Sequence, residues 1–423
     1  MKGKVSLLAA ALAVATPAHS TAGLGAVDTS IRPEARPILA AALLPEERVS
    51  NIGFEDWISA FRIRAARHGI SPATLDRAFA GVRYNTDVIQ RDRNQSEFTK
   101  TIWDYLDTAA SDLRVTNGQV ALRENAALLN QIEDTYRVPA EIITAIWGLE
   151  SAYGTFRGSE NVIEAVATLA YDGRRAAFFE GELVAALQIL ESGDVGPNAM
   201  TGSWAGAMGH TQFMPSSFLA HAVDHDGNGK RDIWSDDPTD ALASTAKYLA
   251  DAGWIDGQPW GMEVILPTDF DVSLTGHSVK KSPADWAALG VRDTYGHPVP
   301  DHGEASVILP AGAGGVAFII FQNFKVLERY NPADAYVLAV GHLGDRIRGG
   351  PAINGNWPRE LRALLLAERI ELQERLTSAG YDTQGVDGKI GPNTIAAIRG
   401  YQKSVGMQPD GYASTKVLAQ LRQ

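Results

Sequence analysis

Cysteine is absent from all 423 residues, and positive charge is scarce. Without cysteine the chain can form no disulfide, and no cysteine is available to carry an N-terminal lipid anchor. The 38 Lys and Arg residues are outnumbered by 50 Asp and Glu residues, which gives a formal net charge of −12. Because no cation-rich block occurs either, the composition disfavours a nucleic-acid-binding protein and a protein that adheres to an acidic membrane surface.

Long hydrophobic runs are missing as well. The apolar run at residues 5–15 is too short to cross a bilayer as a mature helix. It follows two lysines and precedes small residues at Ala18, Ser20 and Ala22, a pattern typical of a secretory signal peptide. An uncleaved anchor is the alternative. We expect a signal peptide over residues 1–22, export to the periplasm without a lipid anchor, and no transmembrane segment in the mature protein.

Helical patterns dominate the chain after a short linker, which we place at residues 23–47 because of its Ala and Pro content. Apolar residues recur at helical spacing in several segments, namely 54–68, 119–136, 161–170, 176–190 and 332–346. Their lengths suit a bundle-like α core over residues 48–347. Within it, β-rich pieces at 262–266 and 306–309 predict a small β-containing subdomain, at about 257–315.

The C-terminal part has the pattern of a separate module. Residues 348–360 have the Gly, Pro and Asn content of an interdomain linker. Residues 361–423 contain an Asp-Gly turn followed by an apolar helix twice, at Asp387-Gly388 and again at Asp410-Gly411. Two such units predict a small three-helix domain. The fold class we expect is mainly α (α+β).

The segment at residues 138–154 is the first candidate for chemistry. Ile142, Ile143, Ile146 and Trp147 recur at helical spacing, and Glu150 continues the same row. A buried carboxyl group tends to stay protonated near neutral pH, which is what a general acid requires. The alternative is that Glu150 lies just past the buried turn and points to solvent, as most glutamates do. The helix alone does not decide between them.

A second candidate is the segment at residues 202–217, which is rich in Gly and Ala and nearly free of charge. With Ser203, Trp204, Gln212 and Phe213 exposed on a loop, it would suit one wall of a carbohydrate cleft, because sugars offer hydroxyls to polar groups and apolar faces to aromatic rings. Pro215 and Ser216 should start the next helix. The alternative is a tight glycine-rich turn in the core.

The residues that come next have the spacing of a calcium loop. Asp224, Asp226, Asn228 and the Lys230 carbonyl occupy alternate positions around a turn glycine. Ser235 stands where such a loop usually has its bidentate Glu. A later acid must complete the site, and Asp237 and Asp240 are the candidates. The alternative is a solvated acidic turn.

Two further groups are candidate cleft residues. Arg174 and Arg175 could bind carboxylates of a substrate, although an exposed Arg pair is more often plain surface. Tyr330, Asn331 and Tyr336 could converge near one point, and the alternative for them is a helix cap with core aromatics. No second catalytic acid is evident, although an ordinary glycosidase needs two carboxylates. No Gly-x-Ser-x-Gly elbow, phosphate loop or zinc-type His pair occurs.

Taken together, these motifs resemble the B-type lytic murein transglycosylases, in one order and with compatible spacing over residues 54–344. The residues that carry the resemblance are Trp147-Gly-Leu-Glu-Ser-Ala-Tyr-Gly154, Arg174-Arg175, Ser203 to Ser216, the Asp-rich loop and Arg329-Tyr330-Asn331. Residues 361–421 resemble a bacterial peptidoglycan-binding domain of the Val-Asp-Gly, Gly-Pro-x-Thr type.

The resemblance implies a lysozyme-like α-helical catalytic domain that binds peptidoglycan glycan strands. It places the family's catalytic acid on Glu150 and its substrate-binding residues on a second set: Tyr105, Arg174, Arg175, Ser203, Gln212, Tyr330, Asn331 and Tyr336. The neighbouring Phe213 belongs with that set on our interpretation of the loop. A structural Ca²⁺ maps onto Asp224, Asp226, Asn228, Lys230 and Asp240, and catalysis needs no cofactor. Two extra residues around Asp236 and the pair His210-Thr211 depart from the family pattern.

The reaction that the resemblance implies accounts for the missing second acid. In that family one glutamic acid protonates the glycosidic oxygen between N-acetylmuramic acid and N-acetylglucosamine. The carboxylate then takes the proton of the muramoyl C6 hydroxyl, which attacks C1 and gives a 1,6-anhydromuramoyl end without water. The alternatives are a hydrolytic muramidase and a non-catalytic cell-wall binding scaffold. We expect a monomer, and other cell-wall enzymes are candidate partners.

Overall fold

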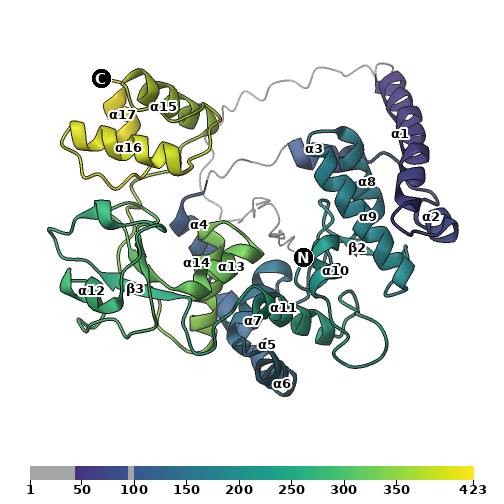
Figure 1. Ribbon diagram of the computed structural model, residues 1–423, viewed down its shortest axis with the longest axis horizontal. Helices are drawn as coiled ribbons and strands as arrows, with labels where there is room; N and C mark the ends of the chain where they lie inside the picture. The colour runs from purple at the N-terminus through teal and green to yellow at the C-terminus, as the bar shows by residue number, and fades with distance from the viewer. Residues whose placement is uncertain (1–42, 94–99) are drawn as a thin grey trace, which may run out of the picture. The chain divides into compact units, whose positions relative to one another are not determined.

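The computed structural model describes residues 43–93 and 100–423, with side chains from residue 53 onward (Figure 1). The predicted signal peptide at 1–22 lies outside the described residues, as does most of the predicted linker. Helix α1, Leu43–Ala66, begins slightly before the boundary expected at residue 48. Among the described residues, none of the helices is both long and apolar enough to span a bilayer.

The chain divides into two compact units. Unit 1 combines residues 43–93 with Glu150–Ser244, and unit 2 combines residues 100–149 with Thr245–Gln423. Two helices, α7 at Ala140–Ser151 and α11 at Thr239–Asp251, have residues in both units.

The described residues of unit 1 are mainly helical and include one two-stranded β pairing. Its remaining helices are α2 (Pro72–Ala78), α3 (Thr86–Arg93), α8 (Val162–Asp172), α9 (Ala176–Ser192) and α10 (Pro215–His221). Helix α8 is buried along nearly its whole length and packs on α9, as the predicted segments 161–170 and 176–190 anticipated. Strands β1 (Glu160–Asn161) and β2 (Thr201–Gly202) pair antiparallel and join the start of the α8 region to the glycine-rich segment.

Unit 2 starts with helices α4 (Ile102–Ala109), α5 (Asp112–Glu124) and α6 (Ala126–Tyr136). The prediction of a single helix over 119–136 is wrong, because the helix is interrupted at Asn125. The Asn125 side-chain amide donates to the Ala121 carbonyl, and its backbone leaves helical geometry at φ −107°. Val120 is 36% exposed and does not face the core.

The predicted β subdomain is present as a four-stranded antiparallel sheet. Its strands, in the order β4-β3-β6-β5, are Arg292–Asp293, Gly261–Ile265, Ala317–Ile320 and Ser306–Ile308. Short helices η1 (Val272–Leu274) and α12 (Pro283–Ala288) cover it, and Trp286 of α12 is fully buried in its core. The sheet extends to Ile320, past the expected end at residue 315, because β6 pairs with both β3 and β5.

Helices α13 (Gln322–Tyr330) and α14 (Asp334–Ile347) follow the sheet, and α14 packs on α4 and α5. Tyr336, Val340 and Leu343 on α14 are buried. The C-terminal module has three helices, α15 (Leu366–Ser378), α16 (Pro392–Ser404) and α17 (Thr415–Leu421), around their own apolar core. The three-helix prediction is confirmed.

The repeated Asp-Gly turns of the module have the same supports. Gln373 accepts from the Gly388 N–H, and Arg369 donates to the Gly388 carbonyl. In the second turn, the Gln402 side-chain oxygen accepts from the Gly411 N–H. The Arg399 guanidinium of the same helix donates to the Asp410 carbonyl. Each helix therefore holds the turn that follows it.

Residues 348–360, predicted as an interdomain linker, pack against other residues of unit 2. The Trp357 ring lies 6.4 Å from Phe318 and 6.3 Å from Trp103, and the Arg359 guanidinium bonds both Asp107 carboxylate oxygens. The Glu263 carboxylate accepts from backbone N–H groups of this segment. This segment, residues 348–360, is called the strap below, and it is packed against other residues of unit 2.

Candidate active site

Glu150 lies at the end of α7 and is completely buried. The apolar row that precedes it is buried too, with Ile143 and Ile146 at 0% exposure. Of the two alternatives left open by the sequence, the buried one is therefore correct. The side chain is excluded from water because the helix is buried on nearly every side over its last two turns.

The turn that follows Glu150 has an unusual backbone. Ala152, Tyr153 and Gly154 all have positive φ, at 50°, 58° and 81°. Helix α7 stops at Ser151, and Gly154 is the third left-handed residue after it. A non-glycine residue in this region costs about 1–3 kcal/mol, and such strain tends to gather at functional sites.

Ser151 fixes this turn against the glycine-rich segment. Its buried hydroxyl donates to the His210 carbonyl at 2.5 Å and accepts from the Gly154 N–H at 2.9 Å. The residue that follows Glu150 in sequence thus connects the end of α7 to the loop that carries Gln212.

The glycine-rich segment is more buried than predicted. Trp204, Gln212 and Phe213 are 6%, 6% and 2% exposed, so the prediction that these three side chains are exposed on the loop is wrong. The segment folds back on itself through bridges that pair Met208 with both Gly202 and Phe213. A Cβ at Gly202 would lie 2.3 Å from the Ala207 carbonyl oxygen, so this close return depends on glycine. The tight glycine-rich turn that was the alternative is therefore present, and Ser203 remains half-buried in it.

Gln212 combines backbone strain with an unsatisfied buried acceptor. Its φ is 55°, and its side-chain amide nitrogen donates to the carbonyls of Gly209 at 2.9 Å and Arg157 at 3.1 Å. Within the described part of the chain its carbonyl oxygen, Oε1, has no hydrogen-bond partner. A buried polar atom without a partner is rare and calls for an explanation, and a ligand that donates to Oε1 would supply one.

Arg157 was not identified from the sequence, although it supports this loop. Its guanidinium contacts His210 Nε2 at 3.1 Å, the Ser235 carbonyl at 2.6 Å and the Asp236 carboxylate at 2.6 Å. His210 is buried, and that burial lowers its pKa below the ordinary value. The arrangement joins the Gln212 loop to the chain that leaves the Asp-rich loop.

The Asp-rich loop brings three carboxylates together. Ligand atoms of Asp224, Asp226 and Asp240 lie within 4.8 Å of one another. Asp240 is 3% exposed, and its burial raises the pKa of its carboxyl, although N–H donors from His225 and Asp232 act in the opposite direction. An all-oxygen set with one buried member suits Ca²⁺.

Asp237, the other candidate for the distal ligand, is engaged elsewhere. Its Oδ1 accepts from the backbone and hydroxyl of Thr239, and these bonds lower its pKa. Asn228 stays at the rim of the loop, where its Oδ1 accepts from the Lys230 N–H. The structure therefore favours Asp240 as the acid that completes the cluster.

Arg174 and Arg175 each form an ion pair with a carboxylate of the protein. Both guanidiniums reach Oδ1 of Asp92, at 2.6 and 3.1 Å, and Asp92 is only 2% exposed. Asp92 was not identified from the sequence. Because a buried carboxylate requires a partner, the first role of the Arg pair is to neutralise Asp92. The arginine side chains remain 49% and 33% exposed, which leaves part of each accessible.

The remaining candidates lie in unit 2. The rings of Tyr330 and Tyr336 are parallel, with centroids 6.4 Å apart, and Tyr248 meets Tyr330 edge-on at 5.0 Å. Tyr336 is buried, Tyr330 is half-buried, and Asn331 Oδ1 accepts from the Ala333 N–H. The Tyr330 and Tyr336 rings therefore lie together, whereas the local Asn331 bond and the buried Tyr336 fit the alternative of a cap with core aromatics. Tyr248 was not identified from the sequence.

Tyr105, the last of the predicted cleft residues, is half-buried on α4. It belongs to unit 2, as do Tyr330 and Asn331, whereas Glu150, Ser203 and Gln212 belong to unit 1.

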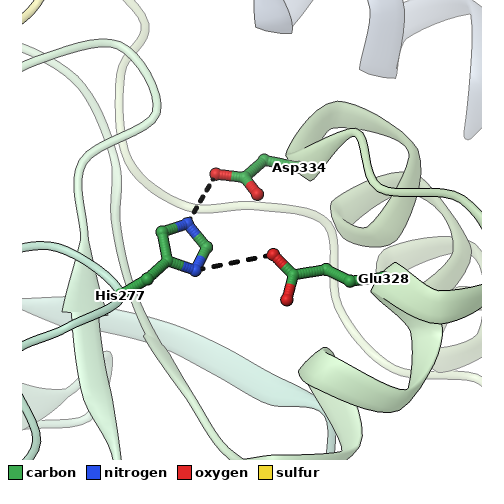
Figure 2. Close-up of side chains that lie close together, drawn as sticks. All are labelled: His277, Glu328 and Asp334. Carbon is green, nitrogen blue, oxygen red and sulfur yellow. Dashed lines mark hydrogen bonds and ion pairs between the residues drawn. The ribbon is translucent and has the colours of Figure 1, made fainter. Parts of the chain in front are cut away.

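A second cluster with metal-binding side chains occurs in unit 2. Figure 2 shows His277 with Nε2 toward Asp334, at 2.8 Å, and Nδ1 toward Glu328, at 3.6 Å. The two carboxylates thus approach different ring nitrogens. Lys325 Nζ lies 2.6 Å from Nδ1 and 2.7 Å from Glu328 Oε2, so a lysine ammonium already occupies the place between them. This cluster is an ion-pair network.

Comparison with known proteins identifies the family. A model of the transglycosylase SLT domain matches residues 53–345, and a model of a peptidoglycan binding domain matches residues 366–421. The chain belongs to the lytic murein transglycosylase family. Its fold is accordingly the mainly helical, lysozyme-like one of that family, followed by the helical peptidoglycan-binding domain.

Several solved structures resemble this transglycosylase. The crystal structure of SltB3 from Pseudomonas aeruginosa in complex with NAG-anhNAM-pentapeptide is 48% identical, with a TM-score of 0.85 over 88% of this chain and 99% of that chain. The Escherichia coli lytic transglycosylase Slt35 in complex with calcium is 30% identical, with a TM-score of 0.60 over 70% of this chain and 93% of that chain.

Among curated proteins, the membrane-bound lytic murein transglycosylase B of Escherichia coli (strain K12) is 36% identical over 235 residues. The match covers 55% of this chain and 63% of that relative, which is less than two thirds of its length.

Proposed function

We propose that the protein is a peptidoglycan lytic transglycosylase that cleaves the MurNAc-GlcNAc β-1,4 bond without water, with Glu150 as its proton-transfer group. The observation that carries the proposal is the complete burial of Glu150 on an apolar helix, directly before a strained turn that is bonded to the Gln212 loop. A carboxyl group removed from water favours its protonated form, which is the form that a general acid needs.

The reaction uses this carboxyl twice. Glu150 donates its proton to the glycosidic oxygen as the bond from C1 to that oxygen breaks. The resulting carboxylate takes the proton of the C6 hydroxyl on the same muramoyl residue, and O6 forms a new bond to C1. The product has a 1,6-anhydromuramoyl end, and Glu150 is protonated again. Because the nucleophile belongs to the substrate, orientation replaces the second carboxylate that a hydrolase would need.

Other residues have supporting roles in this proposal. Gln212 Oε1 is an acceptor for a substrate N–H or O–H, since it lacks a partner among the described residues. Ser203, which is half-buried at the surface of the glycine-rich segment, supplies a polar contact near the reacting sugar. Tyr105, Tyr330, Asn331 and Tyr336 form aromatic and amide contacts to the glycan, and the exposed parts of Arg174 and Arg175 bind substrate carboxylates.

The deciding experiment is mass spectrometry of the muropeptides released from purified sacculi. Anhydromuramoyl ends are expected, whereas reducing ends would indicate a hydrolytic muramidase. Glu150→Gln keeps the shape of the side chain but removes the acid, so cleavage should fall by at least ~10³-fold while sacculus binding is retained.

The matched control is Glu182→Gln. Glu182 is also a buried glutamate of unit 1, at 5% exposure, but its carboxylate caps the start of α10 by accepting from Ser216. This variant should keep its cleavage activity within severalfold. If Glu150→Gln cleaves as well as Glu182→Gln, the assignment of the acid is wrong. If the parent chain binds sacculi but releases no fragment, the protein is a binding scaffold.

The proposal includes a structural Ca²⁺ and export. The Asp224, Asp226 and Asp240 carboxylates, with Asn228 and the Lys230 carbonyl, would hold the ion, which would tie the loop to the start of α11 and has no part in the proton transfers. Export through the signal peptide would bring the enzyme to peptidoglycan in the periplasm, and fractionation of cells into periplasmic and membrane pools tests this.

A further inference from the structure

Unit 2 contains a cavity of about 600 Å³ whose lining includes none of the candidate catalytic residues. Its walls come from the loop at 275–277, from the segment that ends β5 and from the C-terminal module. We propose that this cavity binds the peptide stems of peptidoglycan. The proposal takes its polymer from the proposed function but does not depend on Glu150.

The walls are held together by specific contacts. Arg399 of α16 donates from Nη2 to the Thr275 carbonyl at 3.0 Å and to its hydroxyl at 3.2 Å. The Asp410 carboxylate accepts from the Ala313 N–H at 2.9 Å, and a Cβ at Gly312 would approach that carboxylate to 2.6 Å. The second Asp-Gly turn of the module is thus fastened to the β subdomain, so the cavity exists before any ligand arrives and binding does not have to order it.

The lining is more positive than the chain as a whole. Its charged side chains, with His277 counted as neutral, are four cations and two carboxylates: Lys100, Arg369, Lys389, Arg399, Asp334 and Asp410. Arg369 donates to the carbonyls of Gly388 and Leu364, which are neutral, so these bonds do not cancel its charge. In a protein with a formal net charge of −12, such a cavity selects a ligand with carboxylates.

The uncharged part of the lining favours a peptide over a sugar. It consists mainly of aliphatic groups, such as Ile308, Leu309, Ile390 and Ile395. Apart from the His277 imidazole, Tyr412 is the one aromatic ring among the described lining residues. Glycan sites usually offer flat aromatic faces to the sugar rings, whereas a stem peptide presents alanine methyl groups beside its carboxylates. Stem peptides therefore match both the charge and the apolar surface.

The test is isothermal titration of the full-length chain with two probes, a free pentapeptide stem and glycan strands from which an amidase has removed the stems. Lys389 is exposed at the lining, and its side chain takes no part in the bonds from Gln373 and Arg369 that hold its turn, so Lys389→Glu reverses a charge without disturbing the fold. It should weaken stem binding at least tenfold and leave the affinity for the bare strands within twofold.

Ala363→Trp tests the same site by bulk instead of charge. Ala363 lines the cavity from an irregular segment before α15, so the indole should fill the space and weaken stem binding similarly. Lys403→Glu is the control, because Lys403 is an exposed cation of the module outside the lining, and it should bind the stem like the parent.

The proposal is overturned if the parent does not bind the free stem, or if Lys403→Glu loses as much affinity as Lys389→Glu. Repeating the titration in Glu150→Gln separates this proposal from the proposed function, because stem binding should be the same whether or not Glu150 is the catalytic acid.

Discussion

At the scale of single residues, the candidate site shows what a sequence can and cannot predict. The spacing of Ile142, Ile143 and Ile146 was enough to predict that Glu150 could be buried, because helical periodicity is a local property. The pairing of Arg174 with Asp92 and the burial of Trp204 were not predictable in this way. They depend on segments about 80 residues apart or on how closely a glycine-rich chain returns on itself.

Gln212→Glu is a sensitive probe of the site. The change replaces the amide nitrogen, which donates to Gly209 and Arg157, by an oxygen that faces the same two carbonyls. Each lost donor costs about 1–3 kcal/mol in a buried setting, so the melting temperature should fall by several degrees and cleavage by at least ~10-fold. Gln420→Glu, at the last helix of the module, is the control and should leave both quantities unchanged. Equal melting temperatures for the two variants would contradict the hydrogen bonds assigned to the Gln212 amide.

Two residues of α14 should make the free energy of unfolding change with pH in opposite directions. Burial, with a smaller contribution from Arg346, lowers the pKa of His342 to about 4, so the unfolded chain binds more protons between about pH 4 and 6.5 and stability falls as the pH is lowered through this range. Burial raises the pKa of Asp345 to about 6, so the folded chain binds more protons between about pH 3.8 and 6, and here stability falls as the pH rises.

The corresponding variants should therefore change the pH dependence in opposite directions. His342→Gln should reduce the loss of stability on acidification from pH 6.5 to 4, and Asp345→Asn should increase it, since it removes a group that opposes the loss. Urea unfolding at half-unit pH steps measures both slopes. Parallel slopes for parent and variants would show that neither group is perturbed in the folded chain.

At the scale of elements, the Asp-rich loop connects two parts of unit 1. Asp240 accepts from the N–H groups of His225 and Asp232, and the chain after Asp232 continues to Ser235, whose carbonyl bonds Arg157 and His210. An ion held by this loop would therefore stabilise the same network that supports the Gln212 loop. The motif was predictable because its ligands are close in sequence, but the link to His210 was not, since it depends on tertiary packing.

Removal of calcium should lower the melting temperature. An ion that binds only the folded chain adds about 2.7 kcal/mol when its free concentration is 100 times its Kd, and chelation removes this contribution. Asp240→Asn should melt at a lower temperature than the parent in excess calcium and respond little to chelator. Asp237→Asn, a matched change three residues earlier, should still respond to the chelator. If chelation does not shift the melting curve of the parent, the metal assignment is wrong.

At the scale of the whole molecule, the domain boundaries were only partly predictable. Each module was recognisable from local patterns, such as the Asp-Gly turns of the C-terminal domain. The packing of the strap at 348–360 was not predictable, because Gly and Pro report local backbone geometry but not what Trp357 and Arg359 contact. Composition alone does not distinguish a flexible linker from a packed one.

Two truncations test the strap. A chain that ends at residue 360 keeps the Trp357 contacts with Phe318 and Trp103 and the N–H donors to Glu263. A chain that ends at residue 347 loses all of them, and the half-buried Trp357 contributes only part of the about 3–5 kcal/mol that is typical of a fully buried aromatic side chain. Differential scanning calorimetry should therefore show a clearly lower melting temperature for the shorter chain. A flexible linker would give two chains that melt alike.

The left-handed backbone at Ala152, Tyr153 and Gln212 also bears on how this sequence can change over generations. Glycine adopts positive φ at little steric cost, so backbone strain alone would favour glycine at these positions, but at 212 glycine would also lose the two hydrogen bonds that the amide donates. Those two bonds oppose drift toward glycine at position 212, so glycine is expected there only in a lineage that no longer needs an ordered Gln212 loop for glycan cleavage. Glycine at 212 in an otherwise intact homologous core would mark a descendant that has kept the fold and given up the reaction.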